Sequence, residues 1–201
     1  MRFIGITGGV GAGKSEILGY LAKKPDTRVM LADEIAHELM SPGTECYDRI
    51  CETFGAEDIF LPQGGLDRGK LAAVIFSDEA KRRQMNAIVH PAVRVYVEKE
   101  AAREKQGGKR KLLVLEAALL IEEHYDEICD ELWYIYTSEE NRRIRLKKQR
   151  NYSDEKISEI FNSQLTDEKF RKACRVVIDN NGTIEAAAAQ IEAALMLPHS
   201  M

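Results

Sequence analysis

A short segment near the amino terminus has the residue types and the spacing needed to bind phosphate. Gly8 is followed, after four residues, by Gly13, Lys14 and Ser15. Glycines let a backbone turn its N–H groups inward and let phosphate oxygens approach closely. The lysine adds a positive charge where the β- and γ-phosphates of a nucleotide lie. The pattern therefore predicts a loop that binds the phosphates of a nucleotide.

The segment around this loop gives further roles to its residues. A β-prone run precedes it, and the apolar spacing of Ile17, Leu18 and Leu21 predicts a helix from about residue 14 to 23. The start of that helix adds free N–H groups and the positive end of its dipole. The Ser15 hydroxyl is placed to ligate Mg²⁺, and the Glu16 N–H can reach the α-phosphate. The expected nucleotide-binding set is Gly8, Gly11, Ala12, Gly13, Lys14, Ser15 and Glu16. The alternative is a glycine-rich turn with an ordinary surface lysine.

Asp33 is the next residue that could take part in a reaction. It follows a second β-prone run, residues 28–31. In open α/β sheets ligands bind at the carboxyl ends of the strands, where Asp33 could accept a proton from an attacking hydroxyl. Asp is also a favoured N-cap, here for a helix over residues 34–40. Position alone leaves these two interpretations evenly matched.

A basic run extends from Arg142 to Arg150, with six Arg or Lys residues in nine positions. Helical spacing distributes these charges over at least two faces. One interpretation is a lid whose arginines close over a transferred phosphate, as planar guanidinium groups do. The other is an ordinary solvated helix, with Glu139 and Glu140 pairing with some of the charges.

Composition excludes several classes of protein. The chain has 201 residues, 44% of them hydrophobic, and a net charge of −4. The acidic balance argues against a protein that wraps nucleic acid, and no apolar run is long enough to span a membrane. We expect no signal peptide, because residues 1–7 run directly into the glycines. The sequence has no C-x-x-C pair, so we also expect reduced thiols and a cytoplasmic location.

The elements that must position these residues alternate between strand and helix. Strands are expected at residues 2–6, 28–31, 111–116, 132–136 and 176–178, which predicts an α/β fold with a five-stranded parallel sheet flanked by helices. Helices are expected over residues 33–40, 45–54, 67–76, 79–104 with a bend near Pro91, 139–150, 153–164 and 183–196, and the last five residues as a frayed tail. Residues 34–104 contain no expected strand, so we interpret them as a helical lobe, starting just after the second strand and inserted before the third.

A phosphate loop predicts nucleotide binding but not a reaction. A GTPase would need an N-K-x-D run, which the sequence lacks. A mechanical or nucleic-acid ATPase could use Glu116, at the end of the third strand, in its magnesium site, but the chain is short and not basic. A small-molecule kinase explains more of the features.

The sequence resembles the dephospho-coenzyme A kinases over nearly its whole length. The resemblance rests on several short runs taken together rather than on the glycine loop alone. They are residues 6–15, 32–36, 42–43, 54–55, 65–68 (Gly-Leu-Asp-Arg), 75–76, 88–91 (Ile-Val-His-Pro), 119–122, Gln164 and 177–182 (Val-Ile-Asp-Asn-Asn-Gly).

The resemblance implies a P-loop kinase that uses ATP to phosphorylate the ribose 3′-hydroxyl of dephospho-coenzyme A, the last step of coenzyme A synthesis. It implies a core over about 1–33, 108–138 and 173–201, a substrate lobe over about 34–107, and a lid over about 139–172. Asp33 matches the family's base, Arg145 its lid arginine, and Arg68 and His90 fall in the substrate lobe. The alternative for His90 is a structural residue at the helix bend next to Pro91. Lys14, Asp33 and Arg145 are thus the expected catalytic residues, and Asp33, His90 and Arg68 the expected substrate contacts.

Some positions depart from the family's usual residues. Leu31 stands where the family has an Asp, Ala118 where it has Pro, and Arg175 where it has Asp. Arg142 stands where it commonly has a glutamine, three residues before the lid arginine, and Arg150 is displaced by one position. The loop lysine and serine and Asp33 are intact, so we expect activity, from a monomer without nucleic-acid or membrane partners. The alternatives are a nucleoside or nucleotide kinase and a non-catalytic nucleotide sensor.

Overall fold

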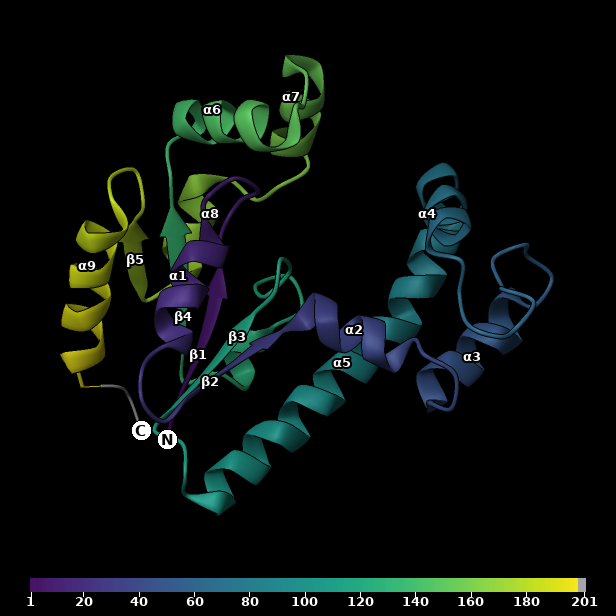
Figure 1. The fold of residues 1–201 in the computed structure, drawn as a ribbon, viewed down its shortest axis with the longest axis horizontal. Coiled ribbons are helices and arrows are strands. Elements are labelled where there is room, and N and C mark those ends of the chain that lie inside the picture. Colours follow the sequence, from purple (N-terminus) through teal and green to yellow (C-terminus); the bar gives the residue numbers. More distant parts are fainter. Residues whose placement is uncertain (199–201) are drawn as a thin grey trace. The chain divides into compact units, whose positions relative to one another are not determined.

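The structure is a computed structural model that describes residues 1–198, so the end of the expected tail lies outside the described residues. Its centre is a five-stranded sheet in the order β2-β3-β1-β4-β5 (Figure 1). The strands are β1 (Arg2–Thr7), β2 (Thr27–Leu31), β3 (Leu112–Glu116), β4 (Glu131–Tyr136) and β5 (Val176–Asp179). The pairings of β1 with β3, of β1 with β4 and of β4 with β5 are parallel. The five expected strands and the α/β class are confirmed.

Burial explains why these segments are strands. Every residue of β1 is buried, and β3 and β4 are nearly continuous runs of buried apolar residues. Such runs are typical of parallel strands that have helices on both faces of the sheet. Ile4, Leu113, Trp133 and Ile135 are fully buried and form the centre of this core.

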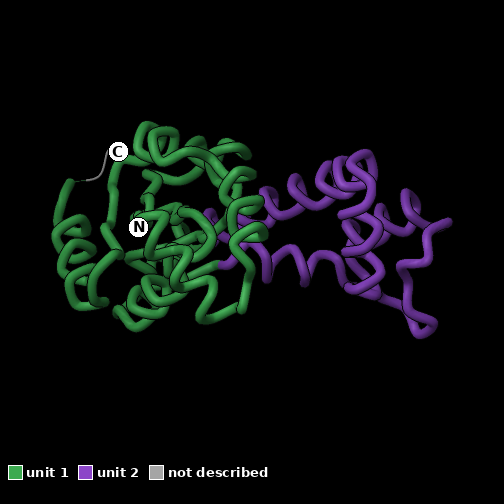
Figure 2. Tube along the Cα trace, turned by 90° about the horizontal axis from the view of Figure 1, so that it is seen from above, with its two compact units in different colours: residues 1–30, 104–201 green, residues 31–103 purple. Residues whose placement is uncertain are grey.

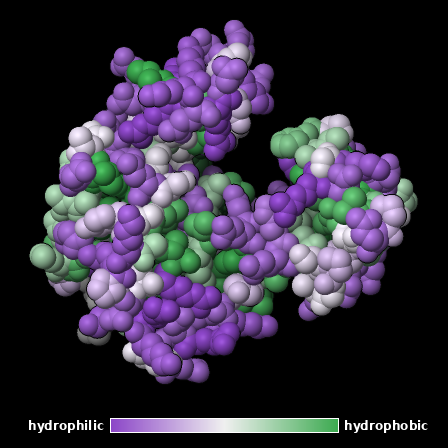
Figure 3. Space-filling view, in the orientation of Figure 1, coloured by the Kyte–Doolittle hydropathy of each residue, from purple (hydrophilic) through white to green (hydrophobic). Residues whose placement is uncertain are grey.

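The chain folds as two compact units (Figure 2). One unit comprises residues 1–30 and 104–198. Its helices are α1 (Lys14–Ala22), α6 (Glu139–Arg150), α7 (Asp154–Asn162), α8 (Asp167–Ala173) and α9 (Ile184–Met196), with a 3₁₀ turn at Tyr125–Glu127. Its α6 and α7 segment is mostly hydrophilic on the face in Figure 3. In this unit α1 contacts α9, and α8 contacts β4.

The second unit, residues 31–103, is helical. It contains α2 (Ala32–Leu39), α3 (Glu45–Phe54), α4 (Arg68–Ser77) and most of α5 (Glu79–Gly107), which runs unbroken through Pro91. Its boundaries lie close to those of the expected helical lobe. The role of this unit in binding substrate, and that of residues 139–172 as a lid, stay predictions.

Side-chain caps determine where several helices begin. Thr44, Asp67, Ser138, Ser153, Thr166 and Thr183 each accept a hydrogen bond from a backbone N–H in the first turn, which satisfies donors that the helix itself leaves open.

The sequence reading missed α8, because Phe170 is the only buried residue in this short, charged helix and no apolar period results. Thr166 followed by Asp167 and Glu168 was the signal that could have revealed it. Within the described residues, no helix is long and apolar enough to cross a membrane.

Candidate active site

The phosphate loop joins β1, the middle strand of the sheet, to α1. Gly8, Gly11 and Gly13 have φ values of 153°, 83° and 84°, which side chains rarely tolerate. Gly13 is the N-cap of α1, so the loop ends at the positive end of that helix. A Cβ on Gly8 would also lie 2.7 Å from the Ile135 carbonyl oxygen of β4. The glycines are therefore required by backbone conformation and by the closeness of the next strand.

Lys14 is held against its own loop and beside a carboxylate. Its Nζ donates a hydrogen bond of 2.7 Å to the Gly8 carbonyl and lies 3.5 Å from Glu116 Oε1. Glu116 ends β3, and its register partner on β1 is Ile6, just before the loop. Both side chains are 16% exposed. The sequence reading considered Glu116 only for a hydrolytic ATPase, but the structure pairs it with the loop lysine.

The carbonyl of Ala12 anchors the loop to two other strand ends. It accepts hydrogen bonds from Thr137 Oγ1 at 3.0 Å, Asn180 Nδ2 at 2.9 Å and Arg145 Nη1 at 3.2 Å. Thr137 follows β4 and Asn180 follows β5. A Cβ on Gly13 would lie 2.4 Å from Asn180 Nδ2. Thr137 and Asn180 thus help to hold the loop, a role that the sequence reading did not assign to them.

Arg145 belongs to α6 and lies against the loop. Besides Ala12, its guanidinium donates to the Asn180 carbonyl, at 2.7 Å from Nη2. The structure therefore brings this expected lid arginine to the loop, where it is bonded to backbone carbonyls. Its contact with a transferred phosphate stays a prediction.

Asp33 lies in the first turn of α2 and is exposed. The helix begins at Ala32, its N-cap is Leu31, and no side chain caps it. The N-cap interpretation of Asp33 is therefore wrong. Asp33 belongs to the unit of residues 31–103, so its approach to the phosphate loop stays a prediction.

Arg68 lines a cavity of about 350 Å³ in the helical unit. The cavity has mostly apolar walls, with His37 from α2 as its other titratable residue. It is lined by His37, Met40, Ser41, Pro42, Leu61, Gly65, Leu66, Arg68, Leu71, Ala72 and Ile75. Arg68 opens α4 directly after the capping residue Asp67, so the Leu-Asp-Arg run combines a helix start with a cation at a cavity wall.

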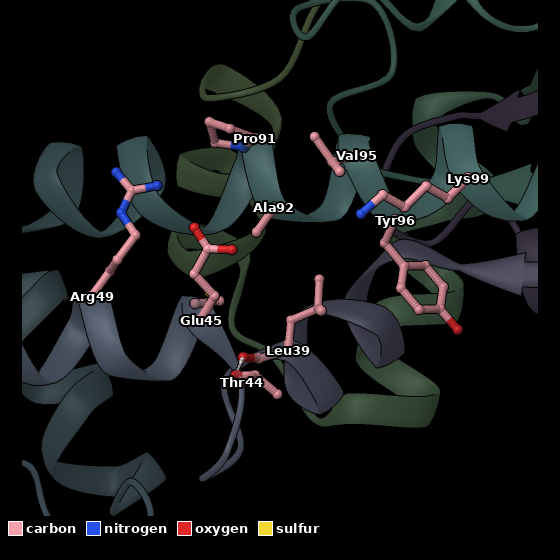
Figure 4. Close-up of a pocket in the computed structure, with 10 residues that line it drawn as sticks. Leu39, Thr44, Glu45, Arg49, Pro91, Ala92, Val95, Tyr96 and Lys99 are labelled. Atoms are coloured by element: carbon pink, nitrogen blue, oxygen red, sulfur yellow. Dashed lines mark hydrogen bonds between the residues drawn. The ribbon is translucent and has the colours of Figure 1, made fainter.

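The same unit holds a second cavity, of about 280 Å³, between α5 and the α2–α3 segment. Figure 4 shows Arg49, Glu45 and Lys99 around apolar Leu39, Ala92 and Val95. His90, on α5, is half-buried and lines neither cavity, although Pro91 next to it lines this one. The expected substrate contact at His90 stays a prediction.

The phosphate loop offers an oxygen ligand that suits Mg²⁺ bound together with a nucleotide. Mg²⁺ prefers hard oxygen ligands and is commonly held by few protein groups together with substrate phosphates. The exposed Ser15 hydroxyl, in the first turn of α1, is such a donor. Within residues 1–198 no group of three or more His, Cys, Asp or Glu side chains could form a metal site by itself.

A parallel α/β sheet with this phosphate loop after its middle strand defines a P-loop nucleotide-binding protein. A family profile described as dephospho-CoA kinase matches residues 2–186. The chain therefore belongs to the dephospho-CoA kinase family. Its activity is that of a phosphotransferase acting in the final step of coenzyme A biosynthesis.

Individual relatives agree with the profile. The chain is 37% identical over 195 residues to the dephospho-CoA kinase of Symbiobacterium thermophilum, covering 96% of this chain and 80% of the relative. It is 36% identical over 192 residues to that of Geobacter sulfurreducens, covering 96% of both. The crystal structure of TT1252 from Thermus thermophilus superposes with a TM-score of 0.77 at 26% identity, covering 96% of both chains. Dephospho-CoA kinase from Campylobacter jejuni, with a TM-score of 0.71 at 18% identity over 97% of this chain and 96% of its own, shows the shared fold.

Proposed function

We propose that the chain transfers the γ-phosphoryl group of ATP to the ribose 3′-hydroxyl of dephospho-coenzyme A. The 3′-oxygen forms a bond to the γ-phosphorus, the bond from that phosphorus to the β-γ bridging oxygen breaks, and ADP leaves. The proposal rests on the glycine loop, where Lys14 Nζ donates a hydrogen bond to the Gly8 carbonyl, and on the family to which the chain belongs. Phosphoryl transfer relies on positioning and on charge stabilisation, and this loop supplies both.

The loop and Lys14 hold the phosphates in this proposal. The backbone N–H groups from Gly11 to Glu16 and the start of α1 favour negative charge. Lys14 supplies a charge to the β- and γ-phosphates, and Glu116 keeps its ammonium close to the loop. Mg²⁺, held by Ser15 and the phosphates, would neutralise charge on the transferred group.

Asp33 is the proposed base. A ribose hydroxyl is a poor nucleophile at neutral pH, and a carboxylate within hydrogen-bond reach can orient it and accept its proton during transfer. The carboxylate is exposed on α2 and is not engaged as a helix cap, so it is available for this role. The proton passes from Asp33 to solvent after the transfer.

The cavity at Arg68 is the proposed place for the rest of the acceptor. Asp33 and His37 are separated by one turn of α2, a rise of about 6 Å, and lie on the same face of the helix. A substrate whose 3′-hydroxyl contacts Asp33 can therefore extend its diphosphate and pantetheine arm toward the cavity that His37 and Arg68 line. Arg68 would pair with the diphosphate, and the apolar walls would contact the arm.

Filling this cavity tests the assignment. Ala72 lines it and Ala73, the next residue of α4, is exposed and does not. Ala72→Phe is expected to raise KM for dephospho-coenzyme A about 10-fold, the equivalent of about 1.4 kcal/mol of lost binding, and to leave KM for ATP unchanged. Ala73→Phe should match the wild type in both. Equal KM values for dephospho-coenzyme A in the two variants would show that the cavity is not part of the substrate site.

The proposed function itself is tested by ADP release from purified protein with ATP and Mg²⁺. Dephospho-coenzyme A should be a far better acceptor than nucleosides or nucleoside monophosphates. Preference for a nucleoside would favour a nucleoside kinase, and ATP binding without ADP release for any acceptor would favour a nucleotide sensor.

A further inference from the structure

Arg142 of α6 lies against the phosphate loop. The interpretation of α6 as an ordinary solvated helix does not explain this position. The Arg142 Nε donates a hydrogen bond of 2.8 Å to the Val10 carbonyl. Its Nη2 donates to Oε1 of Gln164, just beyond α7. The same Oε1 accepts the Val10 N–H at 3.4 Å. The loop, α6 and the end of α7 are thus joined by a closed ring of hydrogen bonds.

Packing holds the Arg142 guanidinium in this position. Its Cζ lies 4.1 Å from the centre of the Phe161 ring of α7, a cation–π distance. Burial lowers the pKa of Arg142, but a guanidinium remains protonated in proteins, so the charge stays in place. Stacking on Phe161 and hydrogen bonds from Nε and Nη2 restrict the orientation of the side chain.

The neighbouring residue of the loop leaves room for this arrangement. A Cβ on Gly9 would lie 2.4 to 2.7 Å from the Arg142 guanidinium atoms. Gly9 has a backbone conformation open to other residues, because its φ is not in the left-handed region. A side chain at this position would therefore displace the Arg142 guanidinium from the place it occupies against the loop.

We propose that Arg142 is a positioning residue that fastens α6 and α7 to the phosphate loop before ATP binds. A glutamine at this position would lack both the Nε donor that binds the Val10 carbonyl and the charged guanidinium that stacks on Phe161. The latch formed by Arg142, Val10, Phe161 and Gln164 holds the loop in one conformation, so that the loop is already ordered when ATP arrives. Preorganisation of this kind improves binding, because less conformational freedom is lost when the ligand arrives.

The inference rests on the ATP binding of the proposed function and not on its acceptor. It is therefore tested in the absence of dephospho-coenzyme A. Arg142→Gln is the test variant, and Lys148→Gln, which removes the same charge from an exposed position of α6, is its control. ATP affinity is measured by calorimetry, and the opening of residues 8–13 by amide hydrogen exchange in the free protein.

Arg142→Gln is expected to weaken ATP binding about 10-fold and to speed exchange at residues 8–13, whereas Lys148→Gln changes neither. At saturating ATP the exchange of the two variants should become equal, and kcat with dephospho-coenzyme A should stay within about 2-fold of the wild type. The double variant Arg142→Gln with Gln164→Leu should be no weaker in ATP binding than the weaker single variant, because one ring is lost in either case.

Other outcomes would overturn the inference. Unchanged exchange of the loop in Arg142→Gln would show that Arg142 does not order it. A fall in kcat with unchanged ATP affinity would place Arg142 on the transferred phosphate instead. Faster exchange throughout residues 104–196 would make its role a general structural one. If wild-type protein failed to bind ATP, the proposed function would fail, while the exchange measurement would still decide whether the latch exists.

Discussion

Lys14→Ala is expected to lower kcat by about 10³-fold or more while the protein remains folded. The ammonium charge stabilises negative charge that grows on the β- and γ-phosphates during transfer, and water in a closed site does not replace it. The measurement is kcat at saturating ATP and dephospho-coenzyme A, with circular dichroism to confirm the fold. Near-normal kcat in this variant would contradict the kinase mechanism.

Lys109→Ala is the matched control for Lys14→Ala. Lys109 is an exposed lysine in the segment between α5 and β3, so its removal changes the net charge equally without altering the phosphate loop. A comparable loss of kcat in both variants would attribute the effect to net charge. A loss of kcat in Lys14→Ala alone would show that the effect comes from the phosphate loop.

The sequence was sufficient for the positions of the five strands and for the phosphate loop, because both are local patterns. β3 is an apolar run that needs burial on both faces, and the loop is defined by residues within one short segment. The anchoring of the loop is different. Asn180 and Thr137 lie 168 and 125 residues from Ala12, whose carbonyl they bind. Only the parallel order of the strands brings those chain segments together, and the single sequence carries no signal of that pairing.

The basic run of α6 shows that the contacts of individual side chains are also not predictable from the sequence alone. Its spacing predicts which residues share a helix face, but not which guanidinium is turned toward a neighbour. Arg142 and Arg145 both contact the phosphate loop, at Val10 and at Ala12, whereas Arg143 pairs with Glu139 and Asp154. The sequence reading selected Arg145 by resemblance, and the departure from glutamine at position 142 was the available signal for the other arginine.

Asp33→Asn is expected to lower kcat by about 10²-fold or more, the typical contribution of a positioned base. Asparagine keeps the size of the side chain but removes its charge and its basicity. Since Leu31 is the N-cap of α2, Asp33 does not cap the helix, and the interaction of its charge with the helix dipole is worth about 0.3–1 kcal/mol. The melting temperature should therefore change little. The measurements are kcat with saturating dephospho-coenzyme A and thermal unfolding of the same preparation.

Glu34→Gln separates the chemistry of Asp33 from its charge in the helix. Glu34 is also exposed in the first turn of α2, so its neutralisation alters the dipole interaction to a similar degree. If Asp33 is the base, the two variants should have similar melting temperatures and kcat should fall only in Asp33→Asn. An Asp33→Asn enzyme that keeps most of its kcat would exclude proton transfer to Asp33. A rise in KM for dephospho-coenzyme A alone would then make Asp33 a group that binds the ribose, because ground-state binding changes KM without changing the height of the chemical barrier.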